Sequence, residues 1–361
     1  MMRRLIIAGG GTGGHIFPAI AIANAVKKIN PDVQILFIGA TGKMEMEKVP
    51  EAGYEIKGIT IAGYNRSSLI KNIWLPSKIA ISFVQVRRIM NSFKPDAVLG
   101  VGGYSTFPVL RYAQGRGIPT YIHESNSFAG KSNVLLGRKA TKIFVAWEGM
   151  QKFFPGHKIM LTGNPIRSAI AHSTVTKKDG LDFFGLKEGL ETVLVVGGSL
   201  GASSINEAVA HHLPQFEQKG LQLIWQTGKI DADKYQALAV GNEHIWVGTF
   251  IKQMEMAYAA ATYIVSRAGA MAVAELCVVG KPAILVPYPF AAEDHQTANA
   301  MSLVANKAAV LLKDSEVEKY LMSELSLLIS DPERSEEMSK NINALCLRDA
   351  DEVVAREINS P

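Results

Sequence analysis

The sequence predicts an α/β protein made of two doubly wound parallel-sheet domains. Short β-branched apolar runs alternate with longer stretches of helical periodicity, which is typical of a parallel sheet covered by helices on both faces. The order strand, glycine turn, helix occurs twice, as LIIAGGGTGGHIFPAIAIANAV and, roughly half the chain later, as TVLVVGGSLGASSINEAVA. The chain has 361 residues, more than one domain usually contains. Two similar domains in tandem are therefore expected.

The apolar runs give the expected strands in order. In the first domain they cover 4–10, 33–40, 95–103, 119–125, 141–147 and 157–163, and in the second 192–198, 221–228, 244–250, 262–269 and 282–289. Asn-Pro in LTGNPIR and the polar segment HSTVTKKDG indicate a loop between the domains. We expect domains over 1–165 and 166–343, with a charged helix at about 344–361 that packs back on the first.

Composition and charge exclude several classes of protein. The formal net charge is +5, but Lys and Arg are scattered without a block of like charge, so we expect no nucleic-acid partner. Cys277 and Cys346 lack the neighbouring Cys or His of a disulfide scaffold or metal site. Arg3 and Arg4 precede only LIIA, too short for a signal-peptide core, and a run of about 18 apolar residues is absent from the sequence. A cytosolic protein that does not span a bilayer is expected.

The first glycine turn, GGGTGGH, formally matches G-x-G-x-x-G through Gly9, Gly11 and Gly14. A dinucleotide site also needs an acid at the end of the second strand, where this chain has Ala40 and Thr41. A P-loop needs a Lys-Ser/Thr pair, which does not follow Gly14. Both glycine turns therefore remain candidate sites for a phosphate or sugar oxygen, bound by backbone amides at a helix N-terminus.

His15 lies in the first turn of the helix that follows these glycines. The positive end of the helix dipole disfavours an imidazolium there, so the ring is expected to be neutral and able to accept a proton. The alternative is that His15 caps the helix or packs against Phe17.

Seven segments occur in one order along the chain: GGGTGGHIFPAIAIA, GVGGYSTFP, IHESNSFAGKSN, GNPIR, GGSLGASSIN, SRAGAMAVAEL and DHQTANA. In this the sequence closely resembles the MurG family, bacterial N-acetylglucosaminyltransferases of peptidoglycan synthesis that convert lipid I to lipid II at the cytoplasmic membrane face. The resemblance implies the GT-B fold, in which two Rossmann-like domains face a deep cleft and the second binds most of UDP-GlcNAc.

The resemblance implies donor contacts mainly in the second domain. The diphosphate would be bound by the turn Gly197–Gly201 with Ser199, and by Arg167 at the domain junction. Glu275 would accept hydrogen bonds from the ribose hydroxyls. The other implied donor contacts are Gln296 on the sugar, the backbone of Ile251 on uracil, and Ala270 and Met271.

The acceptor-side residues implied by the resemblance lie in the first domain: Gly11, Thr12, Gly13, Gly14, His15, Tyr104, Glu124, Asn126 and Asn133. Family members commonly read His-Glu-Gln-Asn where this chain has Ser125 as the third residue, which puts any contact of position 125 in doubt. In DHQT, His295 and Thr297 replace glutamines that some members carry, which leaves Gln296 as the matched residue.

The resemblance implies inverting transfer of GlcNAc to the C4 hydroxyl of the N-acetylmuramyl unit of lipid I, undecaprenyl-diphosphate-MurNAc-pentapeptide. We expect His15 to act as the base, assisted by or exchanging roles with Glu124. The chain has two Asp-x-Asp triplets, at 231–233 and 349–351, which we interpret as helix-start acids or a solvated face. No metal and no other cofactor are expected, so activity should persist in EDTA.

A membrane-docking surface is expected in SLIKNIWLPSKIAISFVQVRRIM, residues 68–90. Helical spacing after Pro76 places Ile79, Phe83 and Val86 on one face. The remaining members of this apolar wedge and its basic rim are Ile73, Trp74, Leu75, Lys71, Lys78, Arg87 and Arg88. The alternative is a core helix whose apolar stripe faces the sheet.

Two other functions fit part of the sequence. Another GT-B enzyme, with a different acceptor or with UDP-GlcNAc 2-epimerase activity, would share the second domain, but GGGTGGH and HESN in the first domain disfavour it. A non-catalytic UDP-sugar sensor would not need His15 and Glu124.

Overall fold

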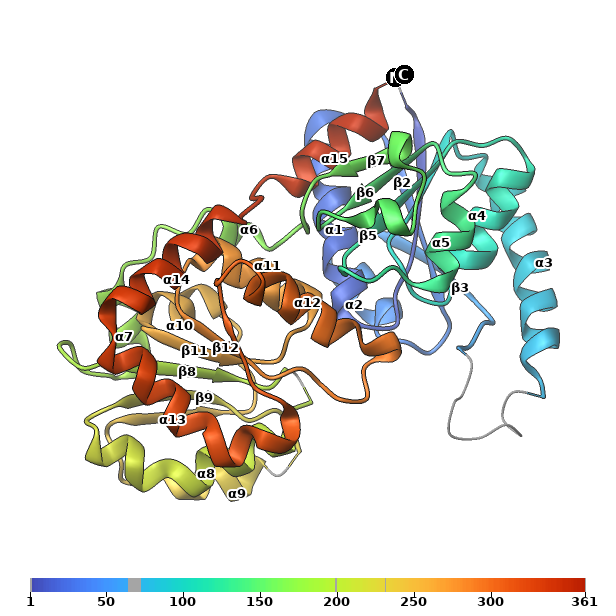
Figure 1. The fold of residues 1–361 in the computed structure, drawn as a ribbon. Helices are drawn as coiled ribbons and strands as arrows, with labels where there is room; N and C mark the ends of the chain where they lie inside the picture. The colour runs from blue at the N-terminus through green and yellow to red at the C-terminus, as the bar shows by residue number, and fades with distance from the viewer. Residues whose placement is uncertain (1, 64–72, 199, 231, 361) are drawn as a thin grey trace. The chain divides into compact units, whose positions relative to one another are not determined.

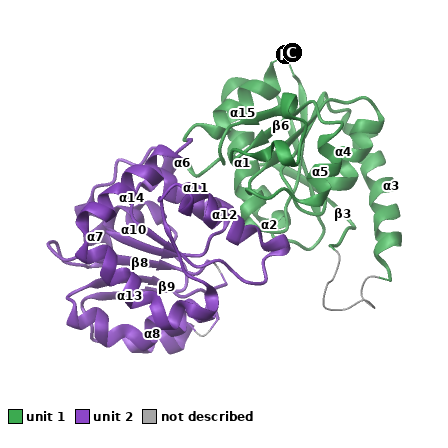
Figure 2. Ribbon diagram, viewed as in Figure 1, with its two compact units in different colours: residues 1–167, 348–361 green, residues 168–347 purple. Residues whose placement is uncertain are grey.

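The computed structural model describes residues 2–63, 73–198, 200–230 and 232–360. The chain divides into two compact units, residues 1–167 with 348–361 and residues 168–347 (Figure 2). The sequence-based boundaries, at residue 165 and at about 344, lie beside these divisions. Each unit is an α/β layer structure with its own parallel sheet (Figure 1).

The sheet of unit 1 has seven strands: β1 (Arg4–Ala8), β2 (Gln34–Ala40), β3 (Glu55–Ile59), β4 (Ala97–Gly100), β5 (Thr120–Glu124), β6 (Lys142–Val145) and β7 (Ile159–Leu161). All pairs are parallel, in the order β3-β2-β1-β4-β5-β6-β7. The order reverses between β1 and β4, so the chain leaves these neighbouring strands in opposite directions. Ligands of open α/β sheets bind at the carboxyl ends of such strands.

Helices cover both faces of this sheet: α1 (Gly13–Ile29), α2 (Glu45–Glu51), α3 (Leu75–Phe93), α4 (Thr106–Gly115), α5 (Lys131–Gly137) and α15 (Ala350–Asn359), with 3-10 turns at η2 (Met150–Lys152) and η3 (Gly156–Lys158). Along β1, Leu5 and Ile7 pack with α1 and α15, whereas Ile6 and Ala8 pack with α3 and α4. Alternate residues of a strand face opposite sides, so burial on both faces requires the continuous apolar run seen in the sequence.

Unit 2 has six parallel strands: β8 (Thr192–Val196), β9 (Gln222–Gln226), β10 (Ile245–Gly248), β11 (Tyr263–Ser266), β12 (Ala283–Leu285) and β13 (Val310–Leu311). Their order is β10-β9-β8-β11-β12-β13, so the reversal lies between β8 and β11. The second glycine turn follows β8 and therefore occupies the position in unit 2 that the first turn occupies in unit 1.

The helices of unit 2 are α6 (Ser168–Ala171), α7 (Lys177–Phe184), α8 (Ser203–Gln218), α9 (Ala232–Ala239), α10 (Met254–Ala260), α11 (Ala270–Val279), α12 (His295–Val304), α13 (Val317–Ser330) and α14 (Pro332–Ala344), with 3-10 turns at η4 (Ala292–Asp294) and η5 (Asp314–Glu316). Val193 and Val195 of β8 belong to a buried cluster that includes Phe216 and Trp225. This cluster fixes α8 and the glycine turn before it against the sheet.

Two strands lie outside the sequence-based set. β3 is an edge strand in which half-exposed and exposed residues alternate, including Glu55 and Lys57. β13 has two residues and is also at an edge. Edge strands need not be apolar on both faces, so the search for continuous apolar runs missed them.

The last helix, α15, packs on α1 in unit 1 (Figure 1). Its buried residues Val354, Ala355 and Ile358 belong to the cluster that also holds Ile22 and Val26 of α1. The end of the chain therefore completes the core of the unit with which the chain began.

Replacing Ile358, which is 3% exposed, with alanine is expected to destabilise unit 1 by about 2–4 kcal/mol through the cavity it leaves. Hydrogen exchange followed by mass spectrometry should show faster exchange in β1 and β4 and unchanged exchange in β8 and β11. The matched control is Arg356→Ala on the exposed side of α15, expected to change stability by no more than about 0.5 kcal/mol. Equal loosening of both units by Ile358→Ala would contradict the prediction.

Candidate active site

The first glycine turn interlocks with a second turn in unit 1. The Gly10 amide donates to the Gly102 carbonyl over 3.2 Å. A Cβ on Gly103 would lie 2.2 Å from the Gly10 oxygen, and one on Gly9 would lie 2.7 Å from the Gly102 oxygen. These glycines therefore allow two backbone segments at the ends of β1 and β4 to touch. The sequence indicated a candidate oxygen-binding site at this turn and did not predict its contact with the turn after β4.

His15 is held by this interlocked backbone. Its Nδ1 lies 3.1 Å from the Gly10 carbonyl oxygen and 3.3 Å from Thr12 Oγ1. A carbonyl can only accept, so the contact requires a proton on Nδ1 and leaves the lone pair of the neutral ring on Nε2. The Cδ2–Nε2 edge lies against Gly102, where a Cβ would be 2.7 Å away. Gly102 thus makes room for the ring.

The loop after β5 brings together three predicted residues, Glu124, Asn126 and Asn133. One oxygen of the buried Glu124 carboxylate accepts from the Asn126 amide at 3.1 Å and its Nδ2 at 3.3 Å. The other accepts from the Gly130 amide at 3.2 Å and from Asn133 Nδ2 at 2.8 Å. Glu124 therefore orders the loop from Asn126 to Asn133.

His123 is a site residue that the sequence reasoning missed. It is fully buried, its Nε2 is 3.1 Å from the Gly163 carbonyl oxygen, and the Ser125 hydroxyl is 3.4 Å from its Nδ1. Burial lowers the pKa of His123 to about 4, so the ring is neutral at neutral pH. A protonated His123 would repel a protonated His15. The residue that departs from the family pattern, Ser125, thus contacts a second histidine.

Two more acceptor-side residues border the same turns. Tyr104, which follows the second turn, is half exposed and its ring covers Gly63, where a Cβ would lie 2.1 Å from the ring. The Gly11 amide, predicted to face a ligand, donates to Glu45 Oε2 over 2.8 Å. A Cβ on Gly11 would meet nothing within 4 Å, so its Cα side is open.

In unit 2, the glycine turn after β8 is fixed by Gln226 at the end of β9. Gln226 Nε2 donates to the Gly198 carbonyl over 3.2 Å, and its Oε1 accepts from the Ile251 amide over 2.9 Å. A Cβ on Gly201 would lie 2.2 Å from the Thr227 oxygen. The buried amide of Gln226 therefore couples the turn to the loop of Ile251. Ser199 lies outside the described residues.

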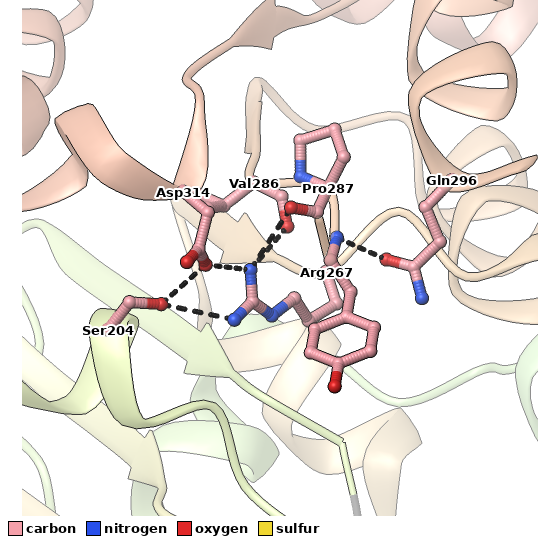
Figure 3. A network of polar contacts seen from close by, with 7 residues as sticks. Ser204, Arg267, Val286, Pro287, Gln296 and Asp314 are labelled. Atoms are coloured by element: carbon pink, nitrogen blue, oxygen red, sulfur yellow. Dashed lines mark hydrogen bonds and ion pairs between the residues drawn. The ribbon is translucent and has the colours of Figure 1, made fainter. Parts of the chain in front are cut away.

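Arg267 organises the loops after β11 and β12 (Figure 3). Its Nη1 donates to the Val286 and Pro287 carbonyls at 3.1 and 3.2 Å and pairs with Asp314 at 2.5 Å. Its Nη2 donates to Ser204 Oγ, 3.1 Å away at the start of α8. The guanidinium therefore joins the N-terminus of α8 to three loops by bonds of fixed geometry.

Of the donor residues predicted from the resemblance, Gln296 is tied to this network. Gln296 Oε1 accepts from the Tyr288 amide over 2.9 Å (Figure 3), and the Tyr288 ring lies beside Arg267. Glu275, in α11, is buried and its Oε2 accepts from the Tyr258 hydroxyl at 2.9 Å. Ala270 and Met271 open α11, and Arg167 is the last residue of unit 1 before the division.

Helix α3 exposes a different apolar face from the predicted one. Val86 is in the core, and Ile79 and Phe83 are partly buried. The exposed apolar side chains are Ile73, Trp74, Ile81 and Val84, with Trp74 68% exposed. Leu75 and Lys78 are partly buried, Arg87 and Arg88 are exposed, and Lys71 lies outside the described residues. Val86 therefore faces the core, as in the alternative interpretation. The exposed apolar residues Ile73 and Trp74 lie just before α3.

The described acids of the two Asp-x-Asp triplets lie at helix starts. Asp349 is the N-cap of α15 with Asp351 in its first turn, and Asp233 is in the first turn of α9. Asp231 lies outside the described residues. Within residues 2–63, 73–198, 200–230 and 232–360, His, Cys, Asp and Glu form no group of three that could hold a metal ion.

Comparison with known proteins places these features in a family. Residues 5–145 match the model of the glycosyltransferase family 28 N-terminal domain, and residues 192–354 that of the family 28 C-terminal domain. The chain is 47% identical over 98% of its length to proteins of Parabacteroides distasonis and Phocaeicola vulgatus, covering 97% and 95% of them. Both are named UDP-N-acetylglucosamine–N-acetylmuramyl-(pentapeptide) pyrophosphoryl-undecaprenol N-acetylglucosamine transferase.

Solved structures agree with this match. MurG of Acinetobacter baumannii superposes with a TM-score of 0.80 at 29% identity, covering 99% of both chains. The UDP-GlcNAc 2-epimerase of Neisseria meningitidis superposes with a TM-score of 0.68 at 15% identity and 99% coverage of both chains, which shows a shared fold alone.

The buried His123 makes unit 1 sensitive to acid. The unfolded chain binds this proton near the ordinary pKa of 6.5 and the folded chain only near a pKa of about 4. The stability contributed by neutral burial is therefore complete above pH 6.5 and is lost as the pH falls, by about 3 kcal/mol at pH 4. NMR of histidine-labelled protein should show the His123 ring neutral down to about pH 4. In His123→Gln this acid-dependent loss of stability should shrink, and a ring that titrates near pH 6.5 would refute the assignment.

Proposed function

The chain belongs to glycosyltransferase family 28, and from this premise we infer that it transfers GlcNAc from UDP-GlcNAc to lipid I, the undecaprenyl-diphosphate-linked N-acetylmuramyl pentapeptide. The product is lipid II of peptidoglycan synthesis. The observation that carries this conclusion is the 47% identity over 98% of the chain to transferases named for this donor and this acceptor.

We propose His15 as the base of the transfer. In an inverting displacement, the C4 hydroxyl of the muramyl unit attacks the anomeric carbon as its proton passes to the base and the bond to UDP breaks. Nδ1 of His15 faces the Gly10 carbonyl, so Nε2 would receive the proton. A neutral imidazole suits this transfer near neutral pH, since its basicity matches the working range.

We propose Glu124 as an organiser of the acceptor loop. Both of its oxygens already accept hydrogen bonds from the Asn126–Asn133 loop. If Glu124 took the proton instead, some of these bonds would have to break. The contacts therefore favour His15 for proton removal, with Asn126, Asn133 and Tyr104 as contacts of the muramyl sugar or its diphosphate.

On the donor side, the amides of the turn Gly197–Gly201, with Ser199 and Arg167, would bind the diphosphate beside the N-terminus of α8. The Ile251 amide already donates to Gln226, so uracil would meet the Ile251 carbonyl, which can accept from the base N3–H. Gln296 would offer its NH2 group to the sugar, since its oxygen is bonded to Tyr288. Glu275 would receive the ribose hydroxyls, and Ala270 and Met271 would line the site.

We also propose that the protein works at the cytoplasmic face of the bacterial inner membrane as a peripheral protein. The relatives' acceptor is built on undecaprenol, which is a lipid. Among the described residues, no helix has the length and apolarity needed to cross a membrane. The exposed apolar residues Ile73 and Trp74 just before α3, and Ile81 and Val84 within it, would insert among anionic lipids, with the exposed Arg87 and Arg88 of α3 nearby in the sequence.

Labelled UDP-GlcNAc and a lipid I analogue are expected to give labelled lipid II analogue, with UDP released only when the acceptor is present. His15→Gln should lower kcat by about 10²–10⁴-fold and leave UDP-GlcNAc affinity unchanged, because it removes the proton acceptor alone. The matched control is the exposed His157→Gln, which should be as active as wild type. Formation of UDP-ManNAc without acceptor, or of UDP and free ManNAc, would identify an epimerase, and tight UDP-GlcNAc binding without turnover a sensor.

The double variant Ile73→Ser, Trp74→Ser should bind anionic phosphatidylglycerol vesicles at least about tenfold more weakly, because each partly inserted side chain contributes about 1.5–3 kcal/mol. Sedimentation with vesicles measures this. Phe290→Ser is the control, since Phe290 is an apolar residue of unit 2 that is more exposed than Trp74, 81% against 68%. Unchanged vesicle binding of the double variant, or an equal loss in Phe290→Ser, would exclude Ile73 and Trp74 as the membrane contact.

A further inference from the structure

A buried carboxylate lies beneath the first glycine turn. Glu45 is the first residue of α2 and is 1% exposed. Its Oε1 accepts from the Ala40 amide at 2.9 Å, and its Oε2 accepts from the Gly11 amide at 2.8 Å. Glu45 therefore joins the end of β2 to the turn that holds His15.

Two glycines provide the space for this carboxylate. A Cβ on Gly10 would lie 2.3–2.7 Å from the three carboxyl atoms of Glu45, and a Cβ on Gly39 would lie 2.4 Å from its Cγ. Gly10 and Gly11 also have φ values of +147° and +88°, which other residues rarely adopt. The backbone of the turn at Gly10 and Gly11 thus leaves room for the Glu45 carboxylate.

The Gly11 amide and the Gly10 carbonyl belong to one peptide unit. In a planar trans peptide the N–H and the C=O point in opposite directions. Glu45 accepts from the N–H, so the carbonyl points away from Glu45, and there it meets His15 Nδ1 at 3.1 Å. An acceptor on the N–H side also polarises the peptide and strengthens its carbonyl as an acceptor.

We propose that Glu45 is a positioning residue that acts through the Gly10–Gly11 peptide to hold the proton of His15 on Nδ1 and to aim Nε2 at the acceptor hydroxyl. The arrangement resembles a carboxylate–histidine pair with one peptide unit inserted between the two side chains. The inference rests on the role of His15 proposed above, which it deepens.

The charges around His15 are consistent with this role. Glu45 brings a negative charge to the turn, and His123, whose charge would act on His15, is neutral at working pH because burial lowers its pKa to about 4. A carboxylate under the turn also repels phosphate. The turn is therefore better suited to orient a base than to bind a diphosphate.

The test is Glu45→Gln, which keeps the shape but places an NH2 group against one of the two backbone N–H donors. We expect kcat to fall by about 10- to 100-fold with an unchanged KM for UDP-GlcNAc. The acidic limb of the pH–rate profile should move to lower pH, because the imidazolium of His15 loses a stabilising charge. Glu45→Asp keeps the charge and should restore the limb toward its wild-type position.

Glu47→Gln on the same helix is the matched control, since its side chain is exposed, and it should leave kcat and the pH profile unchanged. In a His15→Gln background, Glu45→Gln should have no further effect on kcat, because the ring through which it acts is gone. An unshifted pH profile in Glu45→Gln, or additive losses in the double variant, would overturn the proposal.

The ring tautomer gives a readout that does not depend on activity. Nitrogen-15 NMR of histidine-labelled wild type, with His15 assigned by His15→Gln, should show the proton on Nδ1. A proton on Nε2 would refute the role of Glu45. If the proton is on Nδ1 but His15→Gln retains full activity, the proposed base is wrong while the action of Glu45 on the ring stands, so the two failures are distinguishable.

Discussion

Contact between backbone segments at the carboxyl ends of adjacent strands is the constraint on which the rest of the site depends. In unit 1 the Gly10 amide and carbonyl touch the turn after β4, and this contact exists because Gly9 and Gly103 lack side chains. The position of His15 follows from it, since Nδ1 binds the Gly10 carbonyl and the ring edge lies on Gly102. Side chains at these glycines would separate the turns and release the histidine.

The two units use similar turns with different electrostatics. Beneath the turn of unit 1 lies the carboxylate of Glu45, whereas the turn of unit 2 is tied by the neutral amide of Gln226. A negative charge beside a turn opposes anion binding and stabilises a neighbouring imidazolium, while a neutral amide leaves the helix N-terminus attractive to phosphate. This difference supports a division of labour in which the first turn orients a base and the second binds the donor diphosphate.

The sequence predicted those parts of the molecule that residues close together in the chain determine. Apolar runs located the strands buried on both faces, and the motifs identified His15, Glu124, Asn126 and Asn133, of which the last three meet in one loop. Glu45 escaped because KMEMEKVPE reads as a charged surface helix, and its burial depends on glycines at 10 and 39 that are distant in sequence. Helical spacing in α3 likewise identified an apolar stripe but left open whether it faces a membrane or the core, where Val86 lies.

The second strand ends at Ala40 and has no acid of its own there, which argues against a dinucleotide cofactor. The position of Glu45 adds a second argument. A ribose-binding acid at the end of the second strand would have to present its carboxylate to a ligand. Here a carboxylate reaches the same strand end from α2 but binds the Ala40 and Gly11 amides, so its oxygens are used by the protein itself. The glycine pattern therefore does not indicate a dinucleotide cofactor here, because the acid at the end of the second strand binds the protein's own amides. In the role proposed above, the same carboxylate orients His15 through the Gly10–Gly11 peptide.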